Sequence, residues 1–312
     1  MTHTIFIDGE AGTTGLDVRR RLEGRPELEL ISLPEDRRKD AAARAQALNA
    51  ADLVVLCLPD AAAVQAVEMI DNPAVKVIDA STAFRTDPMW AYGFPELDRA
   101  HRDRIAAAPR VSNPGCYPTG FVALVRPLVK AGLAPADWPV TVNAVSGYSG
   151  GGKAMIAEFE GGGAPPYRAY GLSLKHKHVP EMRLHAGLTR DPLFAPAVGA
   201  FRQGMIVEVP LHLSALPGSP SIELVHGALA EAYADQTFVE VAELEATEAM
   251  TGLDPEGLNG TNRLRLHVFG DRGGEQARLV ALLDNLGKGA SGAAVQNLNL
   301  MLGLDETAGL QA

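Results

Sequence analysis

The residues best suited to covalent chemistry lie in the octapeptide SNPGCYPT, residues 112–119. Pro114-Gly115 predicts a turn, and a helix is predicted over about Tyr117–Ala131, so Cys116 should stand where that helix begins. The N-terminus of a helix offers N–H groups and the positive end of the dipole, which favour the nucleophilic thiolate. The same N–H groups can bind the oxyanion that forms when a carbonyl is attacked. We therefore interpret Cys116 as a nucleophile, whereas Cys57, within an apolar strand, is typical of a buried structural cysteine.

A nucleophilic thiol needs a proton shuttle, and the chain offers eight histidines for that role. His176 and His178 stand out because they alternate with Lys175 and Lys177 and precede Pro180-Glu181. Imidazole titrates near neutral pH, so it can accept the proton of a thiol and later return one to the aldehyde oxygen. Spacing along the sequence does not show which ring would reach the thiol, and a solvated cluster that aids solubility stays the alternative.

A glycine-rich turn, GEAGTTG at residues 9–15, follows the predicted strand Thr4–Asp8 and opens the predicted helix Thr14–Glu23. This order of strand, glycine turn and helix is typical of dinucleotide-binding folds. Glycine allows the backbone to approach a pyrophosphate, and the N-terminus of the helix supplies N–H groups to bind it. We therefore expect a dinucleotide to contact Gly9, Gly12, Thr13, Thr14 and Gly15.

The end of the second predicted strand, Leu28–Leu33, indicates which dinucleotide is bound. NAD-binding folds place a carboxylate at the end of this strand, where it bonds the ribose hydroxyls. Here the strand ends at Ser32-Leu33, although acidic residues follow at positions 35 and 36. The basic residues at 37–39 stand close enough to meet a ribose phosphate. The sequence therefore favours NADP over NAD and predicts cofactor contacts from Ser32, Arg37 and Arg38.

Alternating strands and helices fill the first third of the chain and predict a doubly wound, Rossmann-type parallel sheet in an α/β fold. Two further strands are predicted over Leu53–Leu58 and Val75–Ile78, the first as a continuous apolar run. Two further helices are predicted over Asp40–Asn49 and Ala61–Ile70, the second capped by Asp60.

Beyond the cysteine motif, the predicted strands Val140–Val145, Met205–Val209 and Arg263–Val268 have longer, more polar connections and indicate an α+β second domain. The segment Gly150–Pro166 is rich in glycine and predicts a mobile surface loop. Apolar residues recur at helical spacing over Gly289–Leu302. We therefore expect an NADP-binding domain of residues 1–115, completed by a C-terminal helix over 288–312, and a catalytic, substrate and oligomerisation domain of residues 116–287.

Length and composition predict two packed domains, and the low cysteine content favours a cytoplasmic location. The chain has 312 residues, of which 46% are hydrophobic and 21% charged, close to ordinary globular usage. Its net charge of −10, from 28 basic and 38 acidic residues, argues against a nucleic-acid partner. No apolar stretch approaches the roughly 18 residues of a membrane helix, and the N-terminus predicts no signal peptide. Two cysteines are too few for a disulfide framework, and we expect no metal ion.

Longer segments make the chain resemble the N-acetyl-gamma-glutamyl-phosphate reductases, in their short-form branch, within the semialdehyde dehydrogenase superfamily. The resemblance spans most of the chain. The cysteine octapeptide and the string HKHVPE at residues 176–181 are its most specific parts, whereas the glycine turn is not specific. It also includes DASTAFR at 79–85, YGFPE at 92–96, SGYSG at 146–150 and DNLGKGASG at 284–292.

The resemblance implies an NADPH-dependent reduction of N-acetylglutamyl 5-phosphate to N-acetylglutamate 5-semialdehyde, a step of arginine biosynthesis, through a thioester on the enzyme. Cys116 would be the nucleophile and His178 the acid and base, with His176 as the reserve candidate. A homodimer or a homotetramer is expected.

The resemblance also implies two sets of binding residues. Ser81 and Arg85 would hold the phosphate, a task that suits guanidinium chemistry. The segment at 284–292 would return to the cofactor beside the nicotinamide, with contacts from Asn285 and Gly287. Further substrate or phosphate contacts are expected from Asn113, Ser146 and Glu181.

Three other functions stay open from the sequence. A reductase of the related lysine pathway or an aspartate-semialdehyde dehydrogenase would use the same cysteine, histidine and NADP chemistry on another substrate. A non-catalytic NADP-binding sensor could keep the fold without turnover.

Two features depart from the family pattern. The chain is shorter than the long branch of the family, and the residues between the glycines of its turn, Glu10-Ala11 and Thr13-Thr14, differ from the usual residues.

Overall fold

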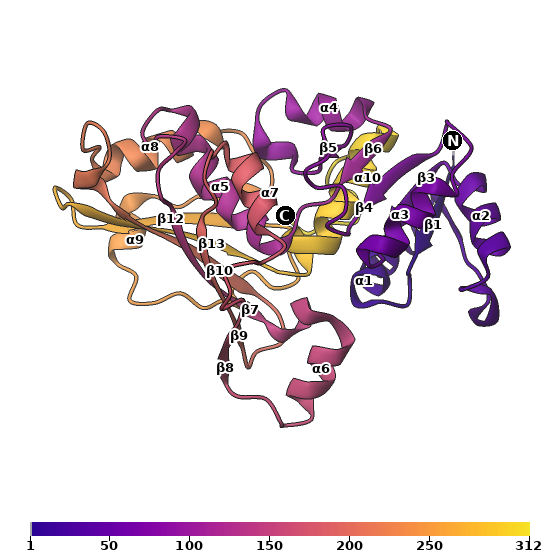
Figure 1. The fold of residues 1–312 in the computed structure, drawn as a ribbon. Helices are drawn as coiled ribbons and strands as arrows, with labels where there is room; N and C mark the ends of the chain where they lie inside the picture. Colours follow the sequence, from indigo (N-terminus) through magenta and orange to yellow (C-terminus); the bar gives the residue numbers. More distant parts are fainter. Residues whose placement is uncertain (1) are drawn as a thin grey trace. The chain divides into compact units, whose positions relative to one another are not determined.

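A computed structural model describes residues 2–312 of the chain, which form two compact units (Figure 1). The first unit comprises the chain up to Gly115 together with Ala290–Gln311, and the second comprises Cys116–Gly289. The chain therefore passes from one unit to the other at Cys116 and returns at Ala290. Each unit is built around a β-sheet of its own.

The first unit contains, within the described residues, a six-stranded sheet in the order β2-β1-β3-β4-β6-β5. The neighbouring strands are parallel, which confirms the predicted doubly wound sheet. Its strands are β1 (His3–Asp8), β2 (Leu28–Ile31), β3 (Leu53–Leu56), β4 (Lys76–Asp79), β5 (Ala91–Tyr92) and β6 (Arg110–Ser112). Its helices are α1 (Thr13–Leu22), α2 (Ala41–Ala50), α3 (Asp60–Glu68), α4 (His101–Ala107) and α10 (Gly292–Leu302), with 3-10 turns at Glu35–Arg37 and Pro95–Leu97.

Strand β1 illustrates how this sheet is covered on both faces. Ile5 and Ile7 pack into a core with apolar residues of α1, α4 and α10. Phe6 points to the opposite face and packs with residues of α2 and α3. Successive side chains of a strand point to opposite faces, so a continuous apolar run is required where both faces are buried. The last helix of the chain, α10, thereby belongs to the core of the first unit.

Asp60 does not cap α3, so that prediction was wrong. The helix begins at Asp60 itself, after Pro59. Its carboxylate accepts hydrogen bonds from the backbone N–H and the hydroxyl of Thr82 instead, because the loop after β4 passes beside the start of the helix. Strands β2 and β3 also end earlier than predicted, at Ile31 and Leu56, where their pairing with β1 ends.

The second unit contains, in the described chain, a seven-stranded sheet in the order β11-β12-β13-β10-β7-β9-β8. The pairs β7–β9 and β11–β12 are parallel and the other neighbours are antiparallel, which confirms the α+β prediction. Its strands are β7 (Thr141–Gly147), β8 (Tyr167–Ala169), β9 (Leu193–Gly199), β10 (Met205–His212), β11 (Val239–Val241), β12 (Leu264–Gly270) and β13 (Gln276–Leu283). Its helices are α5 (Cys116–Lys130), α6 (Gly152–Glu160), α7 (Val179–Ala186), α8 (Ile222–Ala232) and α9 (Leu244–Glu248), with 3-10 turns at Tyr148–Gly151 and Leu213–Ala215. A π-helical turn spans Gly287–Ser291, where the chain leaves this unit.

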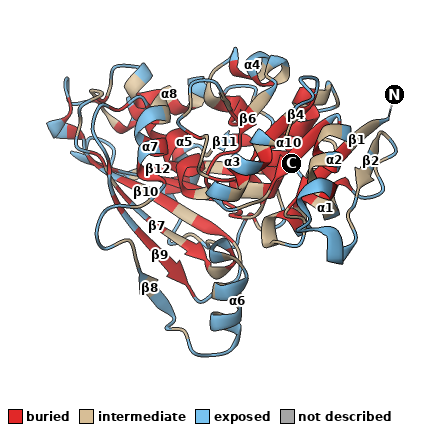
Figure 2. Cartoon of the chain, turned by 45° about the vertical axis from the view of Figure 1, so that its right-hand side comes forward, coloured by how far each residue is buried: buried red, intermediate tan, exposed pale blue. Residues whose placement is uncertain are grey.

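Helix α5 packs closely on the sheet of the second unit, and Figure 2 shows that both the helix and the strands contain buried residues. Residues 117–125 of the helix are buried without interruption. A Cβ atom at Gly120 would lie 2.9 Å from the side chain of Val207, so glycine lets the helix approach β10. Along β10, alternate residues from Met205 to Leu211 are buried, while the residues between them are more exposed. The helix therefore covers one face of the sheet and leaves the other face more open.

The segment Gly150–Pro166, predicted as a loop, contains helix α6. The prediction was wrong because the glycines gather at the two ends of the segment and leave a run without helix breakers between them. The rings of Phe159 and Tyr148 stack with 5.0 Å between centroids, and Glu158 pairs with Arg168 of β8, so both flanks hold the helix. None of the described residues of α6 is fully buried, and its apolar residues Met155, Ile156 and Phe159 are half-buried.

Gly9→Ala tests how tightly the end of β1 is packed. Gly9 has a φ of 88°, and a Cβ atom there would lie 2.3 Å from the carbonyl oxygen of Cys57. Gly24 has a similar φ of 77° with nothing within 4 Å of its Cβ position, so Gly24→Ala is a matched control. We expect the control to lose about 1 kcal/mol of unfolding free energy from backbone strain. Gly9→Ala should lose at least about 3 kcal/mol, because neighbouring backbone must also shift. Urea denaturation measures both losses, and equal values would contradict the close packing.

Candidate functional site

The glycine turn connects β1 to the N-terminus of α1. The backbone N–H of Gly12 donates to the carbonyl oxygen of Gly9 at 3.0 Å, and α1 begins at the next residue, Thr13. A Cβ atom at Gly15 would lie 2.5 Å from that same carbonyl oxygen, so the first turn of α1 can pack against the glycine turn only if it carries glycine there. This backbone geometry suits the close approach of a pyrophosphate to a helix N-terminus.

A cavity of about 600 Å³ lies beside the glycine turn in the first unit. Its walls combine apolar side chains from β1 and its neighbours with Gly9–Ala11 of the turn and the cations Arg38, Lys39 and Arg44. A cavity of this volume with a few polar groups is typical of a small-molecule or cofactor site. The predicted contacts Gly9 and Arg38 both reach it.

The predicted ribose contacts Ser32 and Arg37 are not among the described residues that line this cavity. The Ser32 hydroxyl accepts a hydrogen bond of 2.7 Å from Arg19. Arg37 is exposed and lies near Asp40, with 3.8 Å between guanidinium and carboxylate. Sequence analysis missed Arg19, which stands one helical turn after Gly15. That spacing of four residues is the signal that could have revealed it.

The arginines around this cavity are paired with carboxylates of the same unit. Arg44 contacts both carboxylate oxygens of Asp8, the nearer atoms being 2.7 Å apart. The carboxylate of Glu10 lies between Arg19, at 2.7 Å, and Arg38, at 3.1 Å. Such charge-assisted contacts fix the orientation of a guanidinium group. Positive charge at the cavity is therefore partly neutralised by acidic residues from β1 and the glycine turn.

Asp79 stands at the carboxyl end of β4 and is fully buried. The Ser81 hydroxyl donates a hydrogen bond of 2.6 Å to its carboxylate, and the backbone N–H of Asn113 donates to its carbonyl oxygen at 2.7 Å. Burial raises the pKa of Asp79 from 3.8 to about 6, although the hydrogen bonds from Ser81 and the charge of Arg85 oppose the rise. Two of the predicted phosphate residues, Ser81 and Arg85, thus adjoin a carboxyl group that titrates close to neutral pH.

Arg85 is held by backbone carbonyl groups at the carboxyl ends of two neighbouring strands. Its Nε donates to the carbonyl oxygen of Asn113 at 2.9 Å, and its Nη2 donates to that of Ala80 at 3.0 Å. The side chain of Asn113 accepts a hydrogen bond of 3.2 Å from Asn297 of α10. The structure therefore brings Ser81, Arg85 and Asn113 together at the edge of a parallel sheet where ligands usually bind.

Cys116 is the first residue of α5 in the second unit and is partly exposed. The N–H groups in the first turn of a helix have no acceptor within that helix and can bond a ligand. Gly289 lies directly beside this cysteine, because a Cβ atom at Gly289 would lie 2.9 Å from the Cβ atom of Cys116. The backbone N–H of Gly289 donates to the carbonyl oxygen of Asp284 at 2.9 Å. Glycine thus lets the π-helical turn pass next to the cysteine, a contact that the sequence did not single out.

His176 and His178 lie side by side, with 4.7 Å between their ring centroids. Their rings lie 6.3 and 6.0 Å from that of Tyr117, the residue after Cys116. The backbone N–H of His178 donates to Nδ1 of His176 at 3.1 Å. Burial, together with the charge of Lys177, lowers the pKa of His176 to about 4. His176 is therefore neutral at physiological pH and has one ring nitrogen engaged, while His178 is buried at the N-terminus of α7.

Two tyrosines extend this group of rings. Tyr170 donates from its hydroxyl to the hydroxyl of Tyr117 at 3.2 Å, and Tyr117 donates to the carbonyl oxygen of Ala197 at 3.0 Å. Burial raises the pKa of Tyr170 to about 12, and negative charge on Cys116 adds to the rise. The phenol of Tyr170 therefore stays protonated at neutral pH, close to the thiol. Nothing in the sequence pointed to Tyr170.

Ser146 and Glu181, predicted to contact substrate or phosphate, are both buried in the second unit. The side chain of Ser146 lies beside Tyr117. Burial raises the pKa of Tyr117, and a hydrogen bond with Ser146 opposes this rise. Glu181 lies in the first turn of α7, three residues after His178. Their contacts with a substrate stay predictions.

Asn285 and Gly287 shape the turn that carries Gly289 to the cysteine. Asn285 accepts a hydrogen bond of 2.7 Å from the backbone N–H of Gly204 and donates one of 3.0 Å to the Ser149 hydroxyl. A side chain at Gly287 would overlap neighbouring backbone, so glycine is required there. The predicted contact of Asn285 and Gly287 with a cofactor stays a prediction.

Within residues 2–312, no group of three or more His, Cys, Asp or Glu side chains is placed to hold a metal ion. Among the helices described, none combines the length and the apolar character that crossing a membrane requires.

Comparison with known families defines the class of protein. Residues 4–105 match the family described as "Semialdehyde dehydrogenase, NAD binding domain", and residues 116–285 match "Semialdehyde dehydrogenase, dimerisation domain". The aspartate semialdehyde dehydrogenase II of Vibrio cholerae shares the fold with a TM-score of 0.68 at 16% identity, over 97% of this chain and 98% of that chain. The enzyme of Francisella tularensis gives 0.70 at 12% identity, over 97% and 100%. Fold and domains together define a semialdehyde dehydrogenase with an NAD(P)-binding unit.

Similarity in sequence narrows this class to one family. The N-acetyl-gamma-glutamyl-phosphate reductase of Burkholderia lata is 57% identical over 308 residues, covering 98% of this chain and 98% of the relative. The reductases of the same name from Chelativorans sp. and Brucella ovis are each 57% identical over 97% of this chain, covering 99% and 100% of the relatives. The chain belongs to the N-acetyl-gamma-glutamyl-phosphate reductase family.

Asp79→Asn tests the raised pKa of the buried carboxyl group. Between pH 4 and pH 6 the folded state binds more protons at Asp79 than the unfolded state, so stability falls as pH rises through this window. A difference of about two pH units corresponds to about 3 kcal/mol. The amide of Asp79→Asn does not titrate, so the variant does not lose this stability as pH rises. The unfolding free energy of the variant minus that of the wild type should therefore increase by up to about 3 kcal/mol from pH 4 to pH 7.

Urea denaturation at several pH values measures this difference. Asp36→Asn, which changes an exposed carboxylate of the same unit, serves as the control and should give a nearly constant difference. A constant difference for Asp79→Asn as well would contradict the raised pKa.

Proposed function

We propose that the protein reduces N-acetyl-gamma-glutamyl phosphate with NADPH to N-acetylglutamate 5-semialdehyde and inorganic phosphate, a step of arginine biosynthesis. The observation that carries this proposal is Cys116 at the N-terminus of α5, with His176 and His178 packed around the adjacent Tyr117, in a chain 57% identical to reductases of that name. This identity favours the acetylglutamyl substrate over a lysine-pathway substrate and favours an enzyme over a non-catalytic sensor. The aspartate-semialdehyde dehydrogenases, at 12 and 16% identity, support only the shared fold.

The thiolate of Cys116 attacks the γ-acyl carbon, and the bond from that carbon to the phosphate oxygen breaks, so that inorganic phosphate leaves. The N–H groups at the start of α5 stabilise the oxyanion that forms on the way. The resulting thioester keeps the acyl carbon electrophilic after the good leaving group has gone. NADPH, when bound, supplies the hydride that reduces this thioester. His178 gives a proton to the oxygen of the thiohemiacetal and takes it back as the C–S bond breaks, which releases the aldehyde and restores the thiolate.

His178 is the better of the two candidates for this proton transfer. The low pKa of His176, about 4, makes it a poor acid or base at neutral pH, where catalytic groups work best with a matching pKa. Its Nδ1 is also occupied by the backbone N–H of His178. We therefore assign His176 as a positioning residue that orients the segment carrying His178.

The phosphate group of the substrate is proposed to bind Ser81, Arg85 and Asn113. Their convergence at the carboxyl ends of β4 and β6 supports this role. Backbone carbonyl groups hold the guanidinium of Arg85 in place, so little freedom is lost when it binds an anion. The rest of the substrate is proposed to contact Ser146 and Glu181, which are buried close to Tyr117 and His178 respectively.

NADP is the proposed dinucleotide. The cavity fits a dinucleotide because the glycine turn and a helix N-terminus meet beside it, and because Gly9 and Gly15 leave no room for a side chain. Arg38 and Lys39 line it, and the end of β2 lacks the carboxylate that reads the ribose of NAD. The pyrophosphate would bind the turn residues Gly9, Gly12, Thr13, Thr14 and Gly15, the ribose phosphate Ser32, Arg37 and Arg38, and the nicotinamide Asn285 and Gly287.

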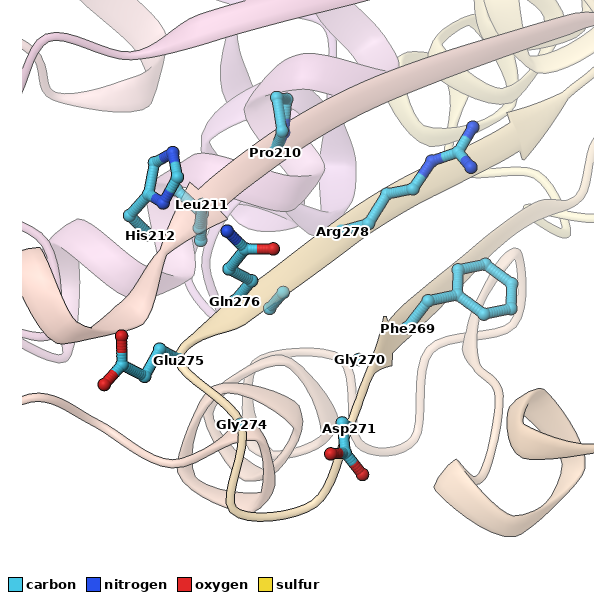
Figure 3. A pocket seen from close by; sticks show the side chains of 11 residues that line it. Pro210, Leu211, His212, Phe269, Gly270, Asp271, Gly274, Glu275, Gln276 and Arg278 are labelled. Carbon is cyan, nitrogen blue, oxygen red and sulfur yellow. The ribbon is translucent and has the colours of Figure 1, made fainter.

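We further propose a homodimer or a homotetramer that assembles through the second unit, which matches a dimerisation domain. Val145 and Ile206 are cross-strand neighbours on the face of the sheet opposite α5, and both are only half-buried. The same face carries Phe269 and Arg278 beside a pocket of about 640 Å³ (Figure 3). This mixture of apolar and charged side chains suits contact with a second copy of the chain.

Cys116→Ser should abolish nearly all turnover while NADP still binds, because serine keeps the size of the side chain but lacks the easily ionised sulfur. Cys57→Ala is the control, since burial raises the pKa of the Cys57 thiol to about 12 and removes it from nucleophilic chemistry. We expect that control to retain turnover. Wild-type rates in Cys116→Ser would overturn the nucleophile assignment.

The assay for this comparison is reduction of NADP by N-acetylglutamate 5-semialdehyde, the reverse reaction. Phosphate must resolve the thioester in this direction, so the rate should depend on added phosphate. Aspartate semialdehyde should be a much poorer substrate under the same conditions. A rate that does not depend on phosphate would contradict the proposed chemistry.

His178→Asn should lower kcat by about 10² to 10⁴, because a general acid and base is lost. The matched variant is His176→Asn, in which an amide oxygen can still accept the backbone N–H of His178. We expect His176→Asn to lose about tenfold or less, with an unchanged pH profile. If instead His176→Asn is inactive and His178→Asn is not, the proton transfer belongs to His176.

A further inference from the structure

The carboxylate of Glu10 occupies an unusual place in the nucleotide cavity. Glu10 is the second residue of the glycine turn, and its side chain is only 12% exposed. It lies between two guanidinium groups, 2.7 Å from Arg19 and 3.1 Å from Arg38. Of these, Glu10 and Arg38 line the cavity itself. One negative charge at the wall of the cavity is thus fixed between two positive charges, of which Arg38 also lines the cavity.

Glu10 is linked through Arg19 to the end of β2, where Rossmann-type folds read the adenosine ribose. Arg19 donates to the Ser32 hydroxyl at 2.7 Å as well as to Glu10, and Ser32 directly follows β2. The glycine turn therefore delivers a carboxylate to the place that β2 itself leaves without one. Glu10 can accept a hydrogen bond from a ribose hydroxyl, as a carboxylate at the end of the second strand does in NAD-binding folds.

We propose that Glu10 is a specificity-determining residue that limits the preference for NADP over NAD. Arg38 can pair either with Glu10 or with a ribose phosphate, so the phosphate must compete with a carboxylate already in place. A carboxylate close to that phosphate also repels it, and juxtaposed like charges in an interface oppose binding strongly. NAD has no such phosphate and gains an acceptor for its ribose hydroxyls. The inference rests on the nucleotide site of the proposed function.

Glu10→Gln removes the charge and keeps the size and the carbonyl acceptor of the side chain. It should tighten binding of NADP relative to NAD by about tenfold or more, because Arg38 and Arg19 lose their shared counter-charge. The matched control is Glu35→Gln, since Glu35 lines the same cavity and is exposed. Because that carboxylate lies outside the Glu10 network, the control should leave the ratio of the two affinities unchanged.

The experiment measures dissociation constants of NADP and NAD for the full-length wild type, Glu10→Gln, Glu35→Gln and Arg38→Gln by isothermal titration calorimetry. Arg38→Gln should weaken NADP relative to NAD and so shift the ratio in the opposite direction to Glu10→Gln. An unchanged ratio in Glu10→Gln, or an equal shift in Glu35→Gln, would overturn the proposal. Failure of the wild type to bind either dinucleotide would instead overturn the proposed function, because binding requires no turnover.

Discussion

The close packing of α5 on the second sheet is the constraint on which the cysteine site depends. The helix can place Cys116 reproducibly only if its own first turn is fixed. Burial of residues 117–125 without interruption and the approach allowed by Gly120 fix that turn against β10. Gly289 also lets the π-helical turn pass directly beside the cysteine. A nucleophile at a helix N-terminus gains from the N–H groups only when backbone and side chain hold one geometry, and here apolar packing supplies that geometry.

Local features of the site were predictable because their physics is local. A strand directly precedes the glycine turn at residues 9–15 and a helix directly follows it. Pro114-Gly115 likewise predicts the turn before Cys116. Alternation of strands and helices predicted a parallel sheet from four of its strands, whereas β5, β6 and the order of the strands were not predicted. Helix α6 was not predicted because the glycines at both ends of its segment suggested a loop. The role of Asp60 was mispredicted because its partner, Thr82, is distant in the sequence.

Features that depend on distant residues could not be predicted in the same way. Spacing in the sequence did not separate His176 from His178, and only the resemblance ranked His178 first. The contact of His176 with the backbone of His178, together with the burial that lowers the pKa of His176, adds a physical reason for that ranking. Tyr170 lies more than fifty residues from Tyr117, yet its hydroxyl bonds to that side chain. The raised pKa of Asp79 likewise follows from its complete burial, which depends on how strands and helices pack rather than on its neighbours in the chain.

The chain has a net charge of −10, yet it is proposed to bind two anions, the dinucleotide and the phosphorylated substrate. Long-range attraction cannot explain such binding, since the overall field repels anions and salt screens it within about 10 Å. The arginines at the proposed sites are also partly neutralised or tethered: Arg44 by Asp8, Arg38 by Glu10, and Arg85 by backbone carbonyl groups. Affinity must therefore arise at contact, from guanidinium groups and N–H groups already held in place. Such a site selects between anions by its geometry and by whether an anion can replace the carboxylate that already pairs with an arginine. A single carboxylate within the site can therefore decide which anion binds.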